Sequence, residues 1–495
     1  MKRRQIFLNA LTTFVQIACN AAILFFLYRF LVRAIGLAGL GVWSLVLATT
    51  SVVALANQGF SASIVKFVAK YAAREAADDT SALVQTAEIS LGLAFAVVLL
   101  VLYAPAKWVL ALVLPRATLA AACAILPYAV ASLWINVTAS ILQAGLAGHE
   151  LITECNYVDL GGSVLYLLLA FAFVPGHGLL GLGYAQIAQA AACFVALWVL
   201  LRRRIPHLPV IPRRWSRSLF REMMGYGVHF QLITAIQAVR EPVTKALLTK
   251  FGGTSMTGLY DMSMRWVVTV RELIVQANQV LVPTVSSLQE RDPAAIPDLY
   301  EKSYRLVFYL AIPAFVFVVV VSPVISVVWL GRYEPLFVGF VALLAAGWLV
   351  NVLSNPAYVV DLGTGELRWV SIGCLLTAVL NAGLGLLCGR LFGGASVVAA
   401  SVSSLIAGYA VILAAYHVQH RVPFRALIPP ASLGILAASA AAIIAFAFFR
   451  TVYGSPFSSR IAFGLAAVVL TIAVLMWIHP MRRRVWNWVT SRAPA

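Results

Sequence analysis

Charged side chains recur at helical spacing inside two apolar segments near the middle of the sequence. In the first segment, successive polar residues lie three or four positions apart: Gln231, Thr234, Gln237, Glu241, Lys245 and Thr249, with Arg240 at the edge of the stripe. Residues at this spacing share one face of a helix. Glu241 and Lys245 also stand in the acid-first order that favours an ion pair between positions i and i+4.

The next segment repeats the pattern. Its polar residues have the same spacing and comprise Asp261, Arg265, Thr269, Glu272, Gln276 and Gln279, with Arg271 nearby. Asp261 and Arg265 are spaced to pair. The two stripes together hold one more basic than acidic residue, and Arg29 and Arg33 at the end of an earlier apolar run add positive charge. Arginine binds phosphate through two parallel hydrogen bonds, so we expect these residues to bind a phosphate-bearing or polyanionic group.

The surrounding chain has the composition of a membrane protein. It is 62% hydrophobic and only 11% charged, whereas soluble chains carry about 25% charged residues. The apolar blocks are long enough to span a bilayer, which takes roughly 20 residues, and they run without alternation, so we expect helices. We predict an all-α polytopic membrane protein of about fourteen spans. Their ranges are 8–32, 37–57, 82–103, 120–146, 152–174, 179–201, 224–249, 256–284, 305–330, 336–358, 367–389, 395–417, 429–449 and 461–479.

The positive charge fits a membrane topology. The net charge of +18 would suggest nucleic acid as the partner of a soluble protein. Here most Lys and Arg residues fall in alternate connections, as expected for cytoplasmic loops. We therefore expect both termini to be cytoplasmic and no nucleic-acid partner. The Pro- and Arg-rich stretch 202–222 is the largest of these basic segments.

Two halves of the chain resemble each other. Segment 33–44 aligns with segment 250–261, which places Gly36 opposite Gly253 and Gly41 opposite Gly258. Such repeats are common in transporters, which hold the substrate site between the repeats. We predict a six-helix N-lobe (1–201), a basic cytoplasmic linker (202–222), a six-helix C-lobe (223–418), and two extra helices with a basic tail (419–495).

The stripes have two interpretations. A charge at the bilayer centre costs roughly 2.5–3.5 kcal/mol on insertion scales, so these residues either pair and hold the two helices together or line a hydrated central cavity. The cavity is favoured because the stripes are longer than one or two ion pairs require. Pro242 interrupts the first stripe and predicts either a static kink or a hinge.

The first half contains fewer embedded charges. Glu88 and Asp159 are candidates for proton or sodium coupling, and each is also explained as a buried protonated acid or a helix-packing group. The six cysteines and seven histidines show no metal-ligand spacing. We expect no metal, no cofactor and no catalytic residues, and the short connections argue against an enzyme.

Three stretches of the chain carry a resemblance to a known family. They are residues 28–48 (YRFLVRAIGLAGLGVWSLVLA), 57–87 (NQGFSASIVKFVAKYAAREAADDTSALVQTA), and 278–313 followed by WLGRYEP at 329–335. These stretches resemble the polysaccharide transporter branch of the multidrug/oligosaccharidyl-lipid/polysaccharide exporter (MOP) superfamily, the Wzx-type O-antigen flippases.

The resemblance implies two six-helix lobes around a central cavity lined by the first and seventh helices. It implies export of a polyprenyl-pyrophosphate-linked oligosaccharide across the bacterial inner membrane, by alternating access, for O-antigen (lipopolysaccharide), capsule or exopolysaccharide synthesis. Membrane lipids, a polysaccharide polymerase and assembly proteins are the implied partners. The basic residues expected to meet the pyrophosphate or anionic sugars are Arg29, Arg33, Arg240, Lys245 and Arg265.

Three alternatives remain open. A drug/cation antiporter of the same superfamily would need a strong acidic site, whereas the stripes are slightly cationic. A membrane oligosaccharide ligase or polymerase would need larger outer loops. A non-transporting scaffold of a polysaccharide assembly complex is the third.

Overall fold

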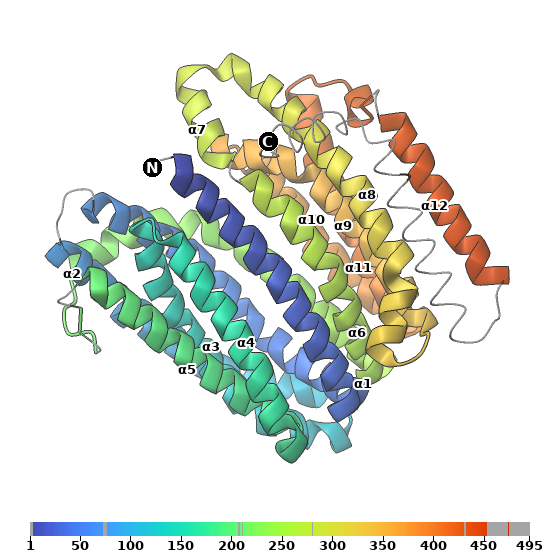
Figure 1. Ribbon diagram of the computed structural model, residues 1–495, viewed down its shortest axis with the longest axis horizontal. Helices are drawn as coiled ribbons and strands as arrows, with labels where there is room; N and C mark the ends of the chain where they lie inside the picture. The colour runs from blue at the N-terminus through green and yellow to red at the C-terminus, as the bar shows by residue number, and fades with distance from the viewer. Residues whose placement is uncertain are drawn as a thin grey trace, which may run out of the picture. The chain divides into compact units, whose positions relative to one another are not determined.

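The described part of the chain is helical. The computed structural model describes residues 3–72, 77–205, 208–209, 211–279, 281–429, 432–452 and 474, and these contain helices and no strand (Figure 1). They form two compact units, Met1–Gly258 and Leu259–Ala495. The lobe boundaries expected from the sequence stay a prediction.

The first unit is built on a long N-terminal helix. Its helices are α1 (Arg3–Ala72), α2 (Ala77–Val113), α3 (Arg116–Gly148), α4 (Ile152–His177), α5 (Leu179–Arg204) and the first part of α6 (Arg217–Gln279). Helix α3 packs against α1, α2 and α5, while α4 packs against α1 and α5. Apolar side chains from α1, α2, α3 and α5 form a shared core around Val84 and Leu142.

The second unit contains the remaining helices. They are the last part of α6, α7 (Val282–Arg291), the 3₁₀ turn η1 (Pro293–Ala295), α8 (Ile296–Leu330), α9 (Pro335–Thr364), α10 (Arg368–Phe392), α11 (Gly394–Gln419), η2 (Phe424–Leu427) and α12 (Leu433–Val452). Helix α10 packs along α11, and α9 packs against α7, α8 and α11. Helix α12 packs against α8.

The predicted spans agree with these helices. Each span from 8–32 to 429–449 overlaps a described helix, and 461–479 lies outside the described residues. Within the described residues, nine helices are long and apolar enough to cross a membrane. The all-α polytopic fold is therefore confirmed, and the chain is a multi-pass membrane protein.

The internal repeat is visible in the backbone. Helix α1 contains one non-helical residue, Gly36, with φ 72° and ψ 172°. Helix α6 contains the aligned residue Gly253 in almost the same conformation, with φ 82° and ψ 170°. Glycine adopts positive φ without steric cost, which explains why both breaks occur at glycine. Each break separates two of the predicted spans.

The second aligned glycine pair brings two helices into backbone contact. A Cβ atom added to Gly41 would collide with the carbonyl oxygen of Thr254. A Cβ atom added to Gly258 would collide with the carbonyl oxygen of Leu37. Leu37 and Thr254 align in the same register as the glycines, so the same contact is made twice with the roles of α1 and α6 exchanged.

The repeat extends beyond this contact. In the first unit, a Cβ on Gly148 of α3 would lie 2.6 Å from Cβ of Val68. In the second unit, a Cβ on Gly363 of α9 would lie 2.7 Å from Cβ of Val285. Val68 and Val285 align in the register of the first glycine pair. The two units therefore repeat their close helix contacts as well as their helix breaks.

The contact between α1 and α6 predicts a large effect of one methyl group. We expect Gly41→Ala to destabilise the protein by roughly 1–3 kcal/mol, because the methyl group overpacks a contact between backbones. Gly161→Ala is the matched control, since a Cβ there would meet nothing within 4 Å. Thermal unfolding of the purified full chain in detergent measures both variants. Equal midpoints for Gly41→Ala and Gly161→Ala would contradict this account of the contact.

Candidate functional site

The polar stripe in the first unit passes from the surface into the protein. Gln237 is exposed, Arg240 is half-buried, and Lys245 is only 3% exposed. The Lys245 Nζ atom lies 2.9 Å from Oε1 of Glu241, whose side chain is 41% exposed. The spacing thus produces the expected ion pair, and the charge of the buried lysine is balanced by a carboxylate nearer the surface.

Hydroxyl groups complete the buried end of this stripe. Thr244 Oγ1 donates to the carbonyl oxygen of Arg240 at 3.0 Å, and Thr249 Oγ1 donates to that of Lys245 at 2.7 Å. The hydroxyls of Thr249 and Thr257 are 2.8 Å apart across the break at Gly253. Buried polar groups are tolerated when they are hydrogen-bonded, so this end of the stripe is adapted to an apolar environment.

The stripe in the second unit has both exposed and anchored members. Asp261 is buried, whereas Arg265 and Glu272 are exposed. Arg271 is half-buried, and its Nε donates to Oδ1 of Asn351 on α9 at 2.8 Å. The exposed residues form a charged face on α6, and Arg271 connects that helix to α9.

Three further contacts connect this part of α6 to α9 and α8. The Arg271 guanidinium lies 4.8 Å from the ring centre of Trp348, a distance typical of a cation–π contact. Asn278 Nδ2 donates to Oδ1 of Asn355 at 2.8 Å, and Ser303 Oγ donates to Oδ1 of Asn278 at 2.7 Å. These polar partners were not predicted from the sequence. The four-residue spacing of the α9 asparagines, within an apolar run, is the signal that would have identified them.

Asp159 joins three helices of the first unit. Its Oδ2 accepts a hydrogen bond from Nε2 of Gln143 on α3 at 3.0 Å and one from Nε2 of Gln16 on α1 at 3.2 Å. One helical turn before it, Asn156 Nδ2 donates to Oγ1 of Thr12 at 3.1 Å. Sequence reasoning identified the acid but not these polar neighbours, which make a small hydrophilic cluster around α4.

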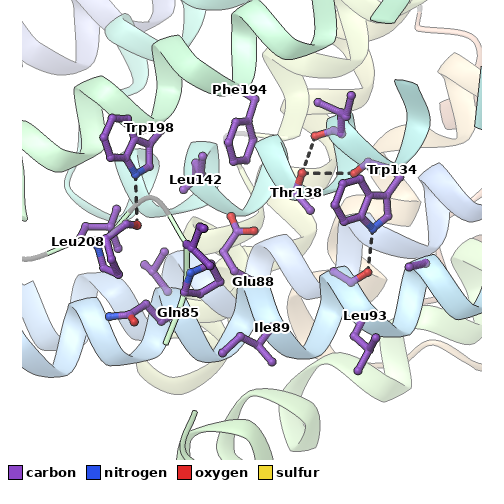
Figure 2. Close-up of a pocket in the computed structure, with 17 residues that line it drawn as sticks. Gln85, Glu88, Ile89, Leu93, Trp134, Thr138, Leu142, Phe194, Trp198 and Leu208 are labelled. Carbon is purple, nitrogen blue, oxygen red and sulfur yellow. Dashed lines mark hydrogen bonds between the residues drawn. The ribbon is translucent and has the colours of Figure 1, made fainter. Parts of the chain in front are cut away.

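Glu88 lies in a different environment on α2. It lines a cavity of about 460 Å³ whose wall does not include Asp159, and Figure 2 shows its carboxylate among apolar and aromatic side chains. Its Oε1 atom is buried and accepts no hydrogen bond from the described part of the chain. Glu88 and Asp159, the two candidates for ion coupling, therefore lie in different environments.

The remaining candidates lie near the two helix breaks. Arg29 is half-buried and Arg33 is exposed on α1, both shortly before Gly36. Pro242 is inside α6, where the helix continues, and the non-helical residue of that helix is Gly253. Among the described residues, no group of three or more His, Cys, Asp or Glu side chains is arranged to hold a metal ion.

Solved structures with the same fold are membrane transporters. The lipid II flippase MurJ in an inward closed conformation superposes with a TM-score of 0.72 at 10% identity, covering 98% of this chain and 100% of MurJ. An inward-facing multidrug resistance MATE family transporter of the MOP superfamily superposes with a TM-score of 0.68 at 14% identity, covering 82% of this chain and 94% of that one.

A third structure is a MOP superfamily transporter from Pyrococcus furiosus. It superposes with a TM-score of 0.60 at 13% identity, covering 83% of this chain and 95% of that chain. Among curated proteins, no sequence matches the chain. At these identities the superpositions establish the fold and leave the substrate open.

A family model assigns the chain more directly. The model of the family described as "Polysaccharide biosynthesis protein" matches residues 30–335, which is more than half of the chain. The matched region includes both helix breaks and both polar stripes. The chain therefore belongs to this polysaccharide biosynthesis protein family and has the fold of the MOP-superfamily transporters.

Proposed function

We propose that the protein is a flippase that exports a polyprenyl-pyrophosphate-linked oligosaccharide across the bacterial inner membrane for O-antigen, capsule or exopolysaccharide assembly. The observation that carries the proposal is the exposed charged face of α6, with Arg265 at its centre, in a chain of the polysaccharide biosynthesis family. The flippase activity named for MurJ, which shares the fold, supports a lipid-linked substrate.

The chemistry of the substrate fits this face. A pyrophosphate carries negative charge that arginine binds through parallel, charge-assisted hydrogen bonds. Arg265 is exposed and Arg240 is half-buried, so both guanidinium groups are partly accessible. The polyprenyl chain needs no polar site, because it stays in the bilayer while the headgroup crosses. Arg29 and Arg33 supply positive charge on α1.

Movement of the headgroup requires two conformations. We propose alternating access of two lobes around a polar cavity lined by the stripes. Gly36 and Gly253 are the residues where the backbone of α1 and α6 departs from helical geometry. A glycine at positive φ changes its dihedral angles at low steric cost. These glycines, with Pro242, are the proposed hinge positions.

Asp159 is the proposed coupling residue. A half-buried carboxylate that is hydrogen-bonded to two neighbouring helices is suited to bind a proton or a small cation, because binding changes the hydrogen bonds that join those helices. The same acid is the observation that favours the second candidate, a drug/cation antiporter with the MATE fold. Resistance conferred on a pump-deficient host would favour the antiporter.

Charge reversal on α6 tests the proposal directly. We expect Arg265→Glu and Arg240→Glu each to lower polymer export by about tenfold or more, because a charge-assisted hydrogen bond contributes about 1.5–3 kcal/mol. Export is measured as surface polysaccharide in a deletion strain, with protein abundance in the membrane as a check. Lys302→Glu is the control, since Lys302 is an exposed residue paired with Asp298 on α8. Normal export in both arginine variants would exclude the proposed site.

Variants of the Glu241–Lys245 ion pair distinguish a role in stability from a role in export. We expect Glu241→Gln to destabilise the protein by about 1–3 kcal/mol, because it removes the carboxylate beside a buried ammonium group. The double variant Glu241→Gln/Lys245→Met removes both charges and should recover most of that stability. If the pair also serves the substrate, the stable double variant still exports poorly. Thermal unfolding and surface polysaccharide are measured on the same variants, and full export by the double variant would assign the pair to helix packing alone.

If Asp159 couples transport to an ion gradient, its substitution should remove the response of transport to that gradient. Asp159→Asn keeps an oxygen that accepts a hydrogen bond, so the helices should remain joined. We expect transport by reconstituted protein to become insensitive to dissipation of the proton or sodium gradient. Glu154→Gln, which changes a nearby acid on the same helix, should retain the response. An unchanged gradient response in Asp159→Asn would remove the residue from the coupling scheme.

A further inference from the structure

The cavity beside Glu88 lies within the first unit, and no residue of either polar stripe lines it. Its wall is formed by α2, α3 and α5 and by the segment that follows α5, including Leu208 and Pro212 (Figure 2). Most lining side chains are apolar, and three are large aromatic rings: Trp134, Phe194 and Trp198. The cavity is therefore an apolar, aromatic site.

The indole nitrogens in the wall are already engaged. Trp134 Nε1 donates to the carbonyl oxygen of Gly92 at 2.9 Å, and Trp198 Nε1 donates to that of Pro209 at 3.3 Å. Figure 2 shows both bonds at the edge of the cavity. The two rings consequently present apolar and π surfaces to an occupant instead of hydrogen-bond donors.

The polar side chains Gln85 and Thr138 are also engaged. Gln85 Oε1 accepts hydrogen bonds from the backbone nitrogens of Arg213 and Arg214 at 3.0 and 3.1 Å, and its Nε2 donates to Ser81 Oγ at 3.0 Å. Thr138 Oγ1 donates to the carbonyl oxygen of Ile135 at 2.8 Å. These bonds also hold the segment after α5 against α2, which closes one side of the cavity.

Glu88 is different from the other polar members of the wall. Among the lining residues, all of which are described, it carries the only ionisable side chain. Its Oε1 is buried and has no hydrogen-bond partner among the residues that the structure describes. A buried polar atom without a partner has a desolvation cost that a ligand donor can remove. The site is therefore suited to a ligand that donates a hydrogen bond to Glu88, and in particular to a positively charged donor.

We propose that this cavity binds an ammonium group carried by an apolar chain. An N–H of the ammonium donates to Glu88 Oε1, and its charge compensates the carboxylate. The faces of Trp134, Phe194 and Trp198 favour a nearby cation through their π electrons, and the apolar wall takes the chain. This ligand chemistry occurs both in aminophospholipid headgroups and in free amphiphilic amines. The site is independent of the proposed export function.

Binding to the full chain tests this site. The probes are dodecylamine and dodecanol, which share a chain and differ in charge, measured by native mass spectrometry on protein released from detergent. We expect the wild type to bind the amine about tenfold more tightly than the alcohol, as expected for one charge-assisted hydrogen bond. Glu88→Gln should abolish that preference, and Glu154→Gln, outside the cavity wall, should retain it. Equal binding of the two probes to wild type, or a preference that survives Glu88→Gln, would overturn the proposal.

A second variant tests the cavity without changing its charge. Ala96 lines the wall, and Ala96→Leu fills part of the space, so we expect binding of both probes to weaken together. Unchanged binding of both would place the ammonium site elsewhere and also overturn the proposal. Thermal unfolding confirms that each variant is folded.

Bilayers of defined lipid identify the source of the ammonium group. The wild type is placed in nanodiscs with or without phosphatidylethanolamine in phosphatidylglycerol, and dodecylamine binding is measured in both. If phosphatidylethanolamine competes in a manner that requires Glu88, the occupant comes from membrane lipid. If binding is the same in both bilayers, the site serves free amines. Each result supports binding of an ammonium group carried by an apolar chain, and it identifies either membrane lipid or a free amine as the source.

Discussion

The contact between α1 and α6 at Gly41 and Gly258 leaves no space for a side chain, and Gly258 lies between the two polar stripes of α6 in the sequence. Within the first unit, the two helices meet through their backbones, so a side chain at either glycine would collide with the other helix. The break at Gly253 lies between the two stripes of α6. The two stripes therefore belong to two separate helical segments of α6.

The environment of each charge indicates its role. Lys245 is buried, and its charge is balanced by Glu241. Thr249, one turn later, donates its hydroxyl hydrogen bond to the carbonyl oxygen of Lys245. Burial of a charge is costly unless it is paired, so these interactions account for its presence in an apolar helix. Arg265 is exposed in an equally apolar protein. Its exposure leaves the guanidinium group accessible, as the proposed binding of an anionic headgroup requires.

The features that could be predicted from the sequence are those that depend on residues close together in the chain. The spans follow from runs of apolar residues, the Glu241–Lys245 pair from helical spacing, and the internal repeat from the alignment of Gly36 with Gly253. The backbone breaks at those two glycines are a finding of the structure. The sequence did not predict the partners of Arg271 or Asp159, because Asn351 and Gln143 lie on other helices and their contacts depend on packing. The cavity beside Glu88 was missed for the same reason, since three helices and a connecting segment form its wall.

The two units share a backbone plan and differ in their polar side chains. The glycine pairs and the close contacts at Gly148 and Gly363 are repeated. The acids Glu88 and Asp159 belong to the first unit, whereas Arg271 and its amide partner on α9 belong to the second. Glycines at backbone contacts are constrained by sterics, because any side chain collides, whereas a polar residue facing an open space is constrained only by its ligand. A duplicated fold can therefore diverge in chemistry while its helix contacts stay fixed, and the unequal side chains of the two units are where distinct binding roles are to be sought.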